Sequence, residues 1–284
     1  MKHLPLLGAA TLVSFVTAYA SEAELAKALT LHASFDKGFE ADFVRDDKGD
    51  KTCYLQSGAE LVPCEESDAF KRTEEAGRFG AGLWFTKKAG IRPIFLGKDI
   101  LGYNPESWSA SVSLWLRLDP DLDLEPGYCD PIQIVAGDTK KGFIFLEWSK
   151  DHQPRHFRYA IRPLIELWDP QGLGWENVEN RPAVELKDAG FSREKWTHAV
   201  FVLDRINESG KASGSLYLDG KHWGDIKDRE LVFGWEADAV RLVLGAAYVG
   251  HLDELSVFDR ALTASEVAAL HALENGIRDL YAKP

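Results

Sequence analysis

The chain is poor in positive charge: 33 lysine and arginine residues stand against 45 aspartate and glutamate residues, a formal net charge of −12 at pH 7. A protein that binds nucleic acid draws its affinity from clustered lysine and arginine side chains. The shortage of these residues therefore argues against a nucleic-acid partner, and we interpret the acidic excess as a source of solubility.

Long hydrophobic runs are also lacking outside the first twenty residues. There, Lys2 and His3 precede an apolar stretch over residues 4–16, and Ala18-Tyr19-Ala20 follows with a small-x-small pattern. These features are typical of a secretory signal peptide. The stretch is shorter than the roughly 20 residues that a spanning helix needs. We therefore expect residues 1–20 to be a signal peptide, and the mature chain, without a membrane span, to be secreted or to reside in the periplasm or cell envelope.

Cysteine is scarce, with three residues in the whole chain. A hairpin or a broad loop between Cys53 and Cys64 would bring these two within bridging distance in an oxidising compartment, whereas Cys129 lies far away. Two alternatives stay open: a Cys53–Cys64 disulfide with Cys129 unpaired, or three buried thiols without a bridge.

Linkers rich in Pro, Gly or Ser are missing, and no segment repeats itself. The hydrophobic content of 45% is ample for a packed core. Sandwiches and barrels of roughly 200–250 residues are common as single units. We therefore predict a single domain over residues 21–284.

Known catalytic motifs are missing as well. A glycan-cleaving β-sandwich places carboxylates at alternate positions of one strand, because acid and nucleophile must flank one bond, and the sequence contains no Glu-x-Asp-x-Glu. It also lacks a serine-nucleophile elbow, a nucleotide-phosphate loop and a histidine-rich zinc pattern. We therefore predict no catalytic residue. A lyase-type set on facing strands stays open, because such neighbours are invisible in one sequence.

Alternation of apolar and polar residues recurs through the middle of the chain, bounded by Gly, Pro, Asn or Asp, which is typical of a multi-stranded antiparallel β fold. The clearest run covers residues 109–118 and has one apolar face (Val112, Leu114, Leu116, Leu118) and one mixed face (Ser111, Ser113, Trp115, Arg117). Further strands are predicted over residues 29–35, 82–85, 132–136, 142–148, 157–161, 197–204, 213–218, 239–244 and 252–258.

Two local signals mark the later part of the chain. Asp219-Gly220 predicts a tight hairpin, because both turn positions tolerate positive φ. Thr263-Ala264-Ser265-Glu266 forms a capping box ahead of an apolar helical stripe and predicts a short C-terminal helix. Residues 162–195 are polar and rich in Pro and Gly, so we expect them to be mostly loop.

Several segments, in order, resemble landmarks of the laminin-G-like jelly-roll family, within the concanavalin A-like lectin/glucanase superfamily. They are residues 31–36, 80–85, 109–117, 195–198, 216–220 and 250–263. The last is the most specific, because a Gly, an apolar residue and Asp253-Glu254 precede an apolar strand and an Arg-Ala-Leu turn. The resemblance implies an all-β fold: a two-sheet antiparallel jelly-roll sandwich whose first and last strands are adjacent.

The resemblance also implies a calcium ion on the rim near those strands, as in many relatives. Carried onto this sequence, its ligands are Asp36, just after the first strand, and Asp253, within the last. Calcium needs about six to eight oxygens, which two carboxylates, backbone carbonyls and water can supply. In the alternative, Asp253 accepts hydrogen bonds from loop amides and Asp36 holds a turn.

The nine tryptophans are the candidate side chains for ligand binding. Sugar rings have C–H-rich faces that stack on aromatic side chains. We predict four ligand-binding residues. Trp168 and Trp175 belong to the long loop, and Trp115 and Arg117 lie on the mixed face of the strand over residues 109–118. The alternative is that each tryptophan is a core or edge residue, as we expect for Trp84, Trp108 and Trp196.

These observations predict a secreted, non-catalytic binding module for a carbohydrate or a cell-surface or matrix protein, with calcium as a stabilising ion. Two alternatives remain: a glycan-active enzyme, either a glycoside hydrolase or a polysaccharide lyase, with an unrecognised site, and a structural envelope protein.

Overall fold

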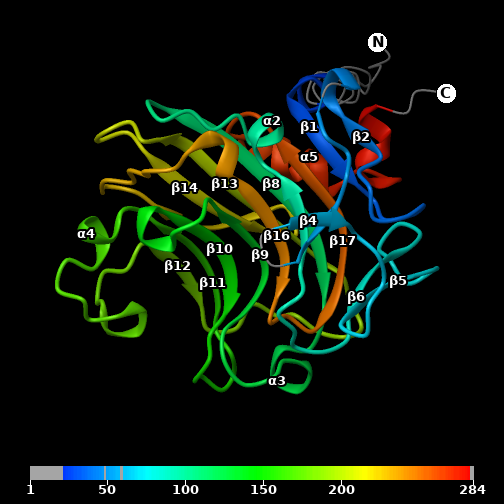
Figure 1. Ribbon diagram of the computed structural model, residues 1–284, viewed down its shortest axis with the longest axis horizontal. Coiled ribbons are helices and arrows are strands. Elements are labelled where there is room, and N and C mark those ends of the chain that lie inside the picture. Colours follow the sequence, from blue (N-terminus) through cyan, green and yellow to red (C-terminus); the bar gives the residue numbers. More distant parts are fainter. Residues whose placement is uncertain (1–21, 48, 58–59, 282–284) are drawn as a thin grey trace, which may run out of the picture.

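The computed structural model describes residues 22–47, 49–57 and 60–281. The signal peptide predicted over residues 1–20 lies outside these residues. Within the described part, the strands form two antiparallel β-sheets packed face to face (Figure 1). The predicted two-sheet sandwich is confirmed.

One sheet has nine strands among the residues described. In order across the sheet they are β15 (Lys221–Ile226), β14 (Ser213–Leu218), β13 (Thr197–Ile206), β8 (Trp108–Arg117), β17 (Gly250–Phe258), β1 (Leu29–Ala33) and β2 (Phe43–Val44), with β6 (Gly82–Phe85) paired to β17 and β5 (Phe70–Thr73) paired to β6. The first and last strands, β1 and β17, are antiparallel neighbours, as the resemblance implies.

The other sheet has eight strands in the same described ranges. In order they are β12 (Ala183–Leu186), β11 (Phe157–Arg162), β10 (Phe143–Trp148), β9 (Cys129–Val135), β16 (Arg241–Ala246), β7 (Pro93–Leu96), β3 (Tyr54–Ser57) and β4 (Glu60–Pro63). Sequence patterns missed β3, β4, β7 and β12 here, as they missed β2 and β5 in the nine-stranded sheet. All six are short, with two to four residues each, too few for alternation to be recognised.

The helices are short and lie outside the two sheets. Residues 22–28 are helical, and the α-helices that follow are α2 (Lys98–Leu101), α3 (Pro120–Asp123), α4 (Ile165–Trp168) and α5 (Ala264–His271). Single 3-10 turns cover Arg45–Asp47, Thr139–Lys141, Trp175–Asn177, Ala237–Ala239 and Gly276–Leu280. No helix in the described part of the chain is long and apolar enough to cross a membrane.

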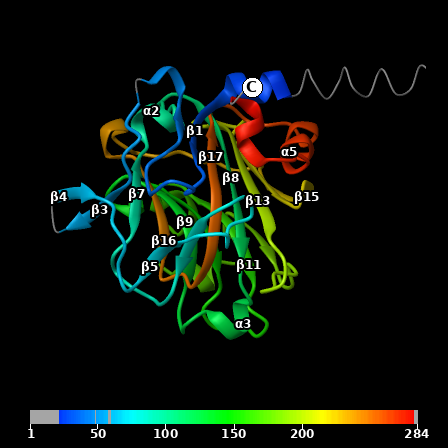
Figure 2. The same cartoon turned by 90° about the vertical axis from the view of Figure 1, so that its right-hand side faces the viewer.

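The main core lies between the sheets, and strand β8 shows why. Its alternate residues Val112, Leu114 and Leu116 are fully buried there, and each such side chain contributes about 1.5–3 kcal/mol. Part of the opposite face of the nine-stranded sheet is also covered, because α5 and residues 22–28 pack on it (Figure 2). For this reason Trp115, on the predicted mixed face, is only 6% exposed.

The two local signals are confirmed. The chain reverses at Asp219 (φ 49°) and Gly220 (φ 74°) between β14 and β15. Thr263 and Glu266 form the capping box of α5, in which the threonine hydroxyl accepts from the Glu266 amide and the carboxylate accepts from the Thr263 amide.

The long loop is more ordered than its composition suggests. It contains α4, a 3-10 turn at Trp175–Asn177 and strand β12. Trp168 and Trp175 pack against Phe145 and Ala160 on the outer face of the eight-stranded sheet. The loop therefore covers this face with its own small core.

The cysteines are unbridged, as in the second of the two alternatives, but Cys64 is half-buried where three buried thiols were expected. The amide of Cys64 donates to the carbonyl of Cys53 at 2.7 Å, so the two residues are neighbours, but both thiols are free. Burial raises the pKa of the Cys53 thiol. It also raises the pKa of the Cys129 thiol, to about 11. Cys53 and Cys129 therefore behave as protonated thiols at neutral pH.

Candidate functional site

Three neighbouring strands of the nine-stranded sheet place Trp84, His251 and Arg117 in one row. His251 of β17 lies opposite Trp84 of β6 on one side and opposite Arg117 of β8 on the other. In β6, Leu83 and Phe85 point into the core, so the side chain between them points outward. Strand pairing therefore builds this row from residues far apart in sequence.

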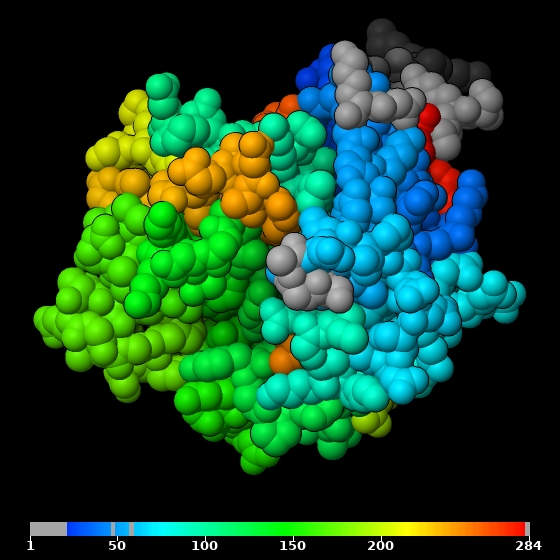
Figure 3. Space-filling view, viewed as in Figure 1, coloured from blue at the N-terminus to red at the C-terminus, as the bar shows by residue number. Residues whose placement is uncertain are grey.

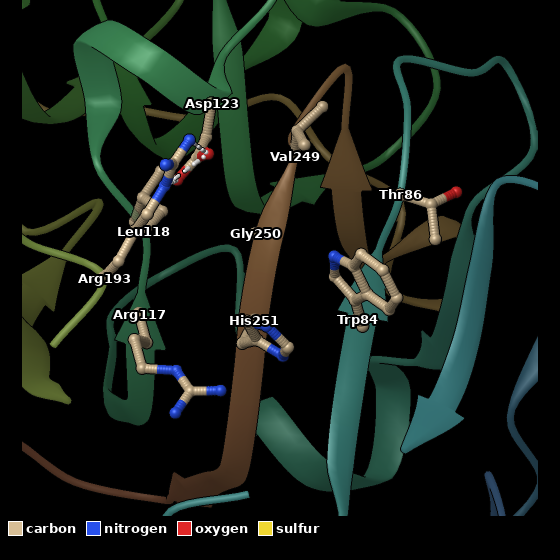
Figure 4. Close-up of a pocket in the computed structure, with 9 residues that line it drawn as sticks. All are labelled: Trp84, Thr86, Arg117, Leu118, Asp123, Arg193, Val249, Gly250 and His251. Atoms are coloured by element: carbon tan, nitrogen blue, oxygen red, sulfur yellow. Dashed lines mark hydrogen bonds and ion pairs between the residues drawn. The ribbon is translucent and has the colours of Figure 1, made fainter. Parts of the chain in front are cut away.

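The row forms the floor of a hollow of about 510 Å³ (Figure 4). Trp84 is 36% exposed. Its ring stacks on His251 with centroids 5.7 Å apart and planes 15° apart, and the ammonium of Lys71 lies 4.8 Å from its centroid. We call Trp84, His251, Arg117 and the adjoining Trp196 the aromatic groove; Trp196 contacts His251 with its ring edge, at a centroid distance of 6.1 Å.

One wall of the hollow is an ion pair. Arg193 Nε donates to Asp123 Oδ1 at 2.9 Å and to Oδ2 at 3.2 Å, and its Nη2 also donates to Oδ1 (Figure 4). The amide of Asp119 donates to Asp123 Oδ2 at 2.7 Å, which fixes the carboxylate at the end of α3. Asp123 is thereby neutralised by its own partner.

The electrostatics of the groove are set by Arg117. Within the described residues Arg117 forms no ion pair: its guanidinium lies 4.9 Å from the ring centroid of Trp196, and Nη2 is 3.4 Å from the carbonyl of Ala76. Burial, helped by the positive charge of Arg117, lowers the pKa of His251 to about 4. At neutral pH the groove therefore presents an uncharged imidazole and an uncompensated guanidinium.

A second hollow, of about 400 Å³, adjoins the aromatic groove at Trp196 and is lined by Arg78, Trp115, Asp219 and His271 as well. Trp115 forms a cluster here with two imidazole rings, with centroids 4.8 Å from His198 and 5.4 Å from His271, and Arg78 lies 4.8 Å from its centroid. The aromatic surface thus continues from Trp84 across the sheet toward α5.

The four predicted ligand-binding residues fall into two groups. Arg117 lines the hollow of the aromatic groove, and Trp115 lines the second hollow beside it. Trp168 and Trp175 lie on the other sheet, 7% and 8% exposed, with the guanidinium of Arg162 over both rings. The structure therefore brings Arg117 and Trp115 together and places Trp168 and Trp175 elsewhere, on the other sheet.

Sequence reasoning missed Trp84, which we expected at a core or edge position, and His251. Trp108 does lie in the core, at 3% exposed. The signal for Trp84 was present in the Leu83-Trp84-Phe85 alternation, but a strand of four residues does not reveal which of its faces lies on the core.

The two carboxylates predicted to bind calcium approach the same loop, residues 77–81. Asp253 is fully buried and accepts from the amides of Arg78 at 2.6 Å, Phe79 at 3.1 Å and Glu254 at 2.8 Å. Asp36 accepts from the amide of Ala81 at 2.8 Å and pairs with Arg278. Because N–H donors and a guanidinium occupy the positions of a cation, this arrangement does not fit calcium.

Asp253→Ala tests this account of the rim. The variant leaves three amides without their acceptor, and we expect it to lose about 2 kcal/mol or more of unfolding free energy. Thermal unfolding of the metal-free wild type should give equal midpoints with and without excess Ca²⁺. A midpoint that rises with Ca²⁺ in the wild type and not in the variant would show instead that the two carboxylates hold the ion.

The eight-stranded sheet carries a hollow of a different kind, of about 440 Å³, whose lining includes Arg92, Gln133 and Val243. Figure 3 looks onto this side of the molecule, where the surface is hollowed between the green segments and the cyan ones. Behind it, Gln133 donates to the buried Asp130 at 2.6 Å. Burial raises the pKa of Asp130, with the neighbouring Glu147 adding to the shift, and burial raises the pKa of Glu147 to about 7.

Comparison with known families gives one match: a model of the concanavalin A-like lectin/glucanases superfamily covers residues 104–268. No curated protein matches the chain in sequence.

Solved structures with a similar fold include domain 4 of AbnA, an extracellular arabinanase from Geobacillus stearothermophilus, in complex with arabinotriose. It has 18% identity and a TM-score of 0.53, over 84% of this chain and 96% of that one. The ligand binding domain of botulinum neurotoxin serotype D, in complex with N-acetylneuraminic acid, has 12% identity and a TM-score of 0.55, over 88% of this chain and 52% of that one. At such identities the likeness shows the fold alone.

Proposed function

Because this chain belongs to the concanavalin A-like lectin/glucanase superfamily, we propose that it is an exported carbohydrate-binding module whose ligand lies in the aromatic groove. The observation that carries the proposal is the exposed Trp84, set in a row with His251 and Arg117 on the floor of a hollow of about 510 Å³. An indole stacks on the C–H face of a sugar, and the polar groups beside it select hydroxyl or carboxylate positions.

The charge of the groove favours an acidic sugar. Arg117 has no carboxylate partner in the described part of the chain, whereas the nearby Arg193 is neutralised by Asp123. In a protein with a net charge of −12, an uncompensated guanidinium in a hollow is a specific binding site for an anion. Arginine binds a carboxylate through two parallel N–H donors. We therefore expect a glycan that carries a carboxylate to bind more tightly than a neutral one.

Arg117→Met tests this charge selection with the two ligands named for the similar structures. N-acetylneuraminic acid should bind the wild type more tightly than arabinotriose, and its affinity should fall as salt is raised. In the variant its affinity should drop by about tenfold or more, because a hydrogen bond to a charged group contributes about 1.5–3 kcal/mol. Isothermal titration calorimetry gives both affinities.

The matched control is Arg241→Met, because Arg241 lies on β16 of the other sheet. This variant should bind like the wild type. If neither sugar binds, a glycan array containing uronic-acid and sialylated oligosaccharides extends the search. An array without any signal would contradict the proposed function.

A glycan-active enzyme is the second candidate function. One observation favours it: Asp130 and Glu147 are buried near one another with raised pKa values, beside the hollow of the eight-stranded sheet, and perturbed carboxyl pairs are enriched at catalytic sites. Release of new reducing ends from a bound glycan would distinguish this function from binding alone.

A further inference from the structure

The hairpin between β10 and β11 carries two histidines that the aromatic groove does not use. The loop over residues 149–156 is closed by the amide of Ser149, which donates to the carbonyl of His156 at 2.9 Å, and by the amide of His156, which donates to Ser149 Oγ at 3.0 Å. Strand β12, which lies beside β11 (Figure 1), presents Glu185 to the same point. The hairpin and the edge strand thus converge on one cluster.

The cluster consists of His152, His156 and Glu185. The imidazole rings are stacked, with centroids 3.8 Å apart and planes 18° apart, and His156 Nδ1 lies 2.5 Å from Glu185 Oε1. One nitrogen of each ring and one carboxylate oxygen all lie within 4.8 Å of one another. Donor atoms at such distances can reach a common ion at about 2.0–2.2 Å once the two rings turn out of their stack, so that their in-plane nitrogen lone pairs point at the ion.

An unpaired atom points to a missing ligand. His152 Nδ1 is shielded from solvent, and it has no hydrogen-bond partner among the described residues. A buried polar atom without a partner costs free energy, so such an atom calls for an explanation. An ion bound by a nitrogen of each ring would supply that partner.

The surroundings hold the carboxylate in place. Glu185 Oε2 is 3.3 Å from Arg158 Nε and also pairs with Arg181, so Oε1 is the oxygen that faces the imidazoles. Groups behind the ligands orient them in known metal sites. Glu176 pairs with both of these guanidiniums as well, so Glu185 shares them with a second carboxylate and keeps negative charge for a cation.

We propose that His152, His156 and Glu185 bind one zinc ion, with water as the fourth ligand. Two imidazoles and one carboxylate are ligands that Zn²⁺ accepts in a tetrahedral site, whereas Ca²⁺ and Mg²⁺ require oxygen. The ion ties the β10–β11 hairpin to the edge strand β12 and thereby stabilises that end of the eight-stranded sheet. A sequence search for spaced zinc motifs misses this site, because Glu185 reaches the histidines only through strand pairing.

Titration of ZnCl₂ into protein freed of metal with EDTA tests the site. We expect one ion per chain, a rise in unfolding temperature with Zn²⁺, and visible absorption of a tetrahedral complex when Co²⁺ replaces Zn²⁺. His152→Ala should lower zinc affinity by at least about 100-fold, since even residues behind the ligands change metal affinity about 10–100-fold.

His152→Ala is the primary variant because it leaves the His156–Glu185 contact in place. Its unfolding temperature in EDTA should match that of the wild type, which shows that it folds. The control is His222→Ala, because His222 also pairs with a carboxylate, Asp225 at 2.7 Å, on an exposed strand. Absence of zinc binding to the wild type, or unchanged affinity in His152→Ala, would overturn the proposal.

Discussion

Arg158→Met should lower the unfolding free energy by about 3–5 kcal/mol, the usual effect of removing one partner of a buried ion pair. Arg158 is fully buried beneath the loop that carries Trp175. Its guanidinium donates to Glu147 at 3.0 Å and to both oxygens of Glu176 at 2.8 and 3.0 Å. Without it, Glu147 stays buried and loses its counter-ion, and Glu176 keeps only Arg181. Urea denaturation followed by tryptophan fluorescence gives the difference.

The unfolding free energy lost in Arg158→Met should depend on pH. Burial raises the pKa of Glu147 to about 7, although the charge of Arg158 favours the ionised form. The variant lacks this charge, so the pKa of Glu147 in its folded state should be higher still, and further from the unfolded value. A carboxyl with a raised folded-state pKa stabilises the fold below its unfolded pKa, and this contribution is lost as pH rises. The difference between variant and wild type should therefore be larger at pH 8 than at pH 5.

Lys98→Met is the matched control for the buried arginine. Lys98 pairs with Asp238 at 2.7 Å, but the side chains are 57% and 80% exposed. Exposed ion pairs contribute little, so the denaturation midpoint should stay close to that of the wild type. A small effect of Arg158→Met, comparable to that of the control, would mean that the buried network does not stabilise the sheet.

Features encoded within a few residues were predictable from the sequence. The Asp219-Gly220 turn, the capping box of α5 and the two faces of β8 each depend on neighbours along the chain. Six short strands were missed because two to four residues carry little periodicity. The cover over Trp115 was missed for another reason: a strand pattern records polarity, but not whether a helix such as α5 packs on the polar face.

The candidate site was predictable in part. Arg117 was assigned to the mixed face of its strand, and it lines the groove. Trp84 and His251 join it through pairings with β17, more than a hundred residues away from β6 and β8, which the sequence does not reveal. Trp168 and Trp175 lie in a polar segment, yet they fold back onto Phe145. Composition alone could not separate an exposed tryptophan from one that a loop buries.

Trp84→Ala should weaken glycan binding by about 30-fold or more. Trp84 supplies the largest exposed apolar surface of the aromatic groove, at 36% exposed, and a tryptophan at the centre of a binding site contributes about 2 kcal/mol or more. The fold should tolerate the change, because the side chain lies on the outer face of β6, away from the core that Leu83 and Phe85 enter. The unfolding midpoint of the variant checks this.

The most direct test is a calorimetric titration of wild type, Trp84→Ala and Trp223→Ala with N-acetylneuraminic acid or the strongest glycan from the array. Trp223 is the matched control, because it is 45% exposed and lies on β15, outside the aromatic groove. We predict that binding is lost or at least about 30-fold weaker in Trp84→Ala and unchanged in Trp223→Ala. Full affinity in Trp84→Ala would contradict the assignment of the aromatic groove as the glycan site.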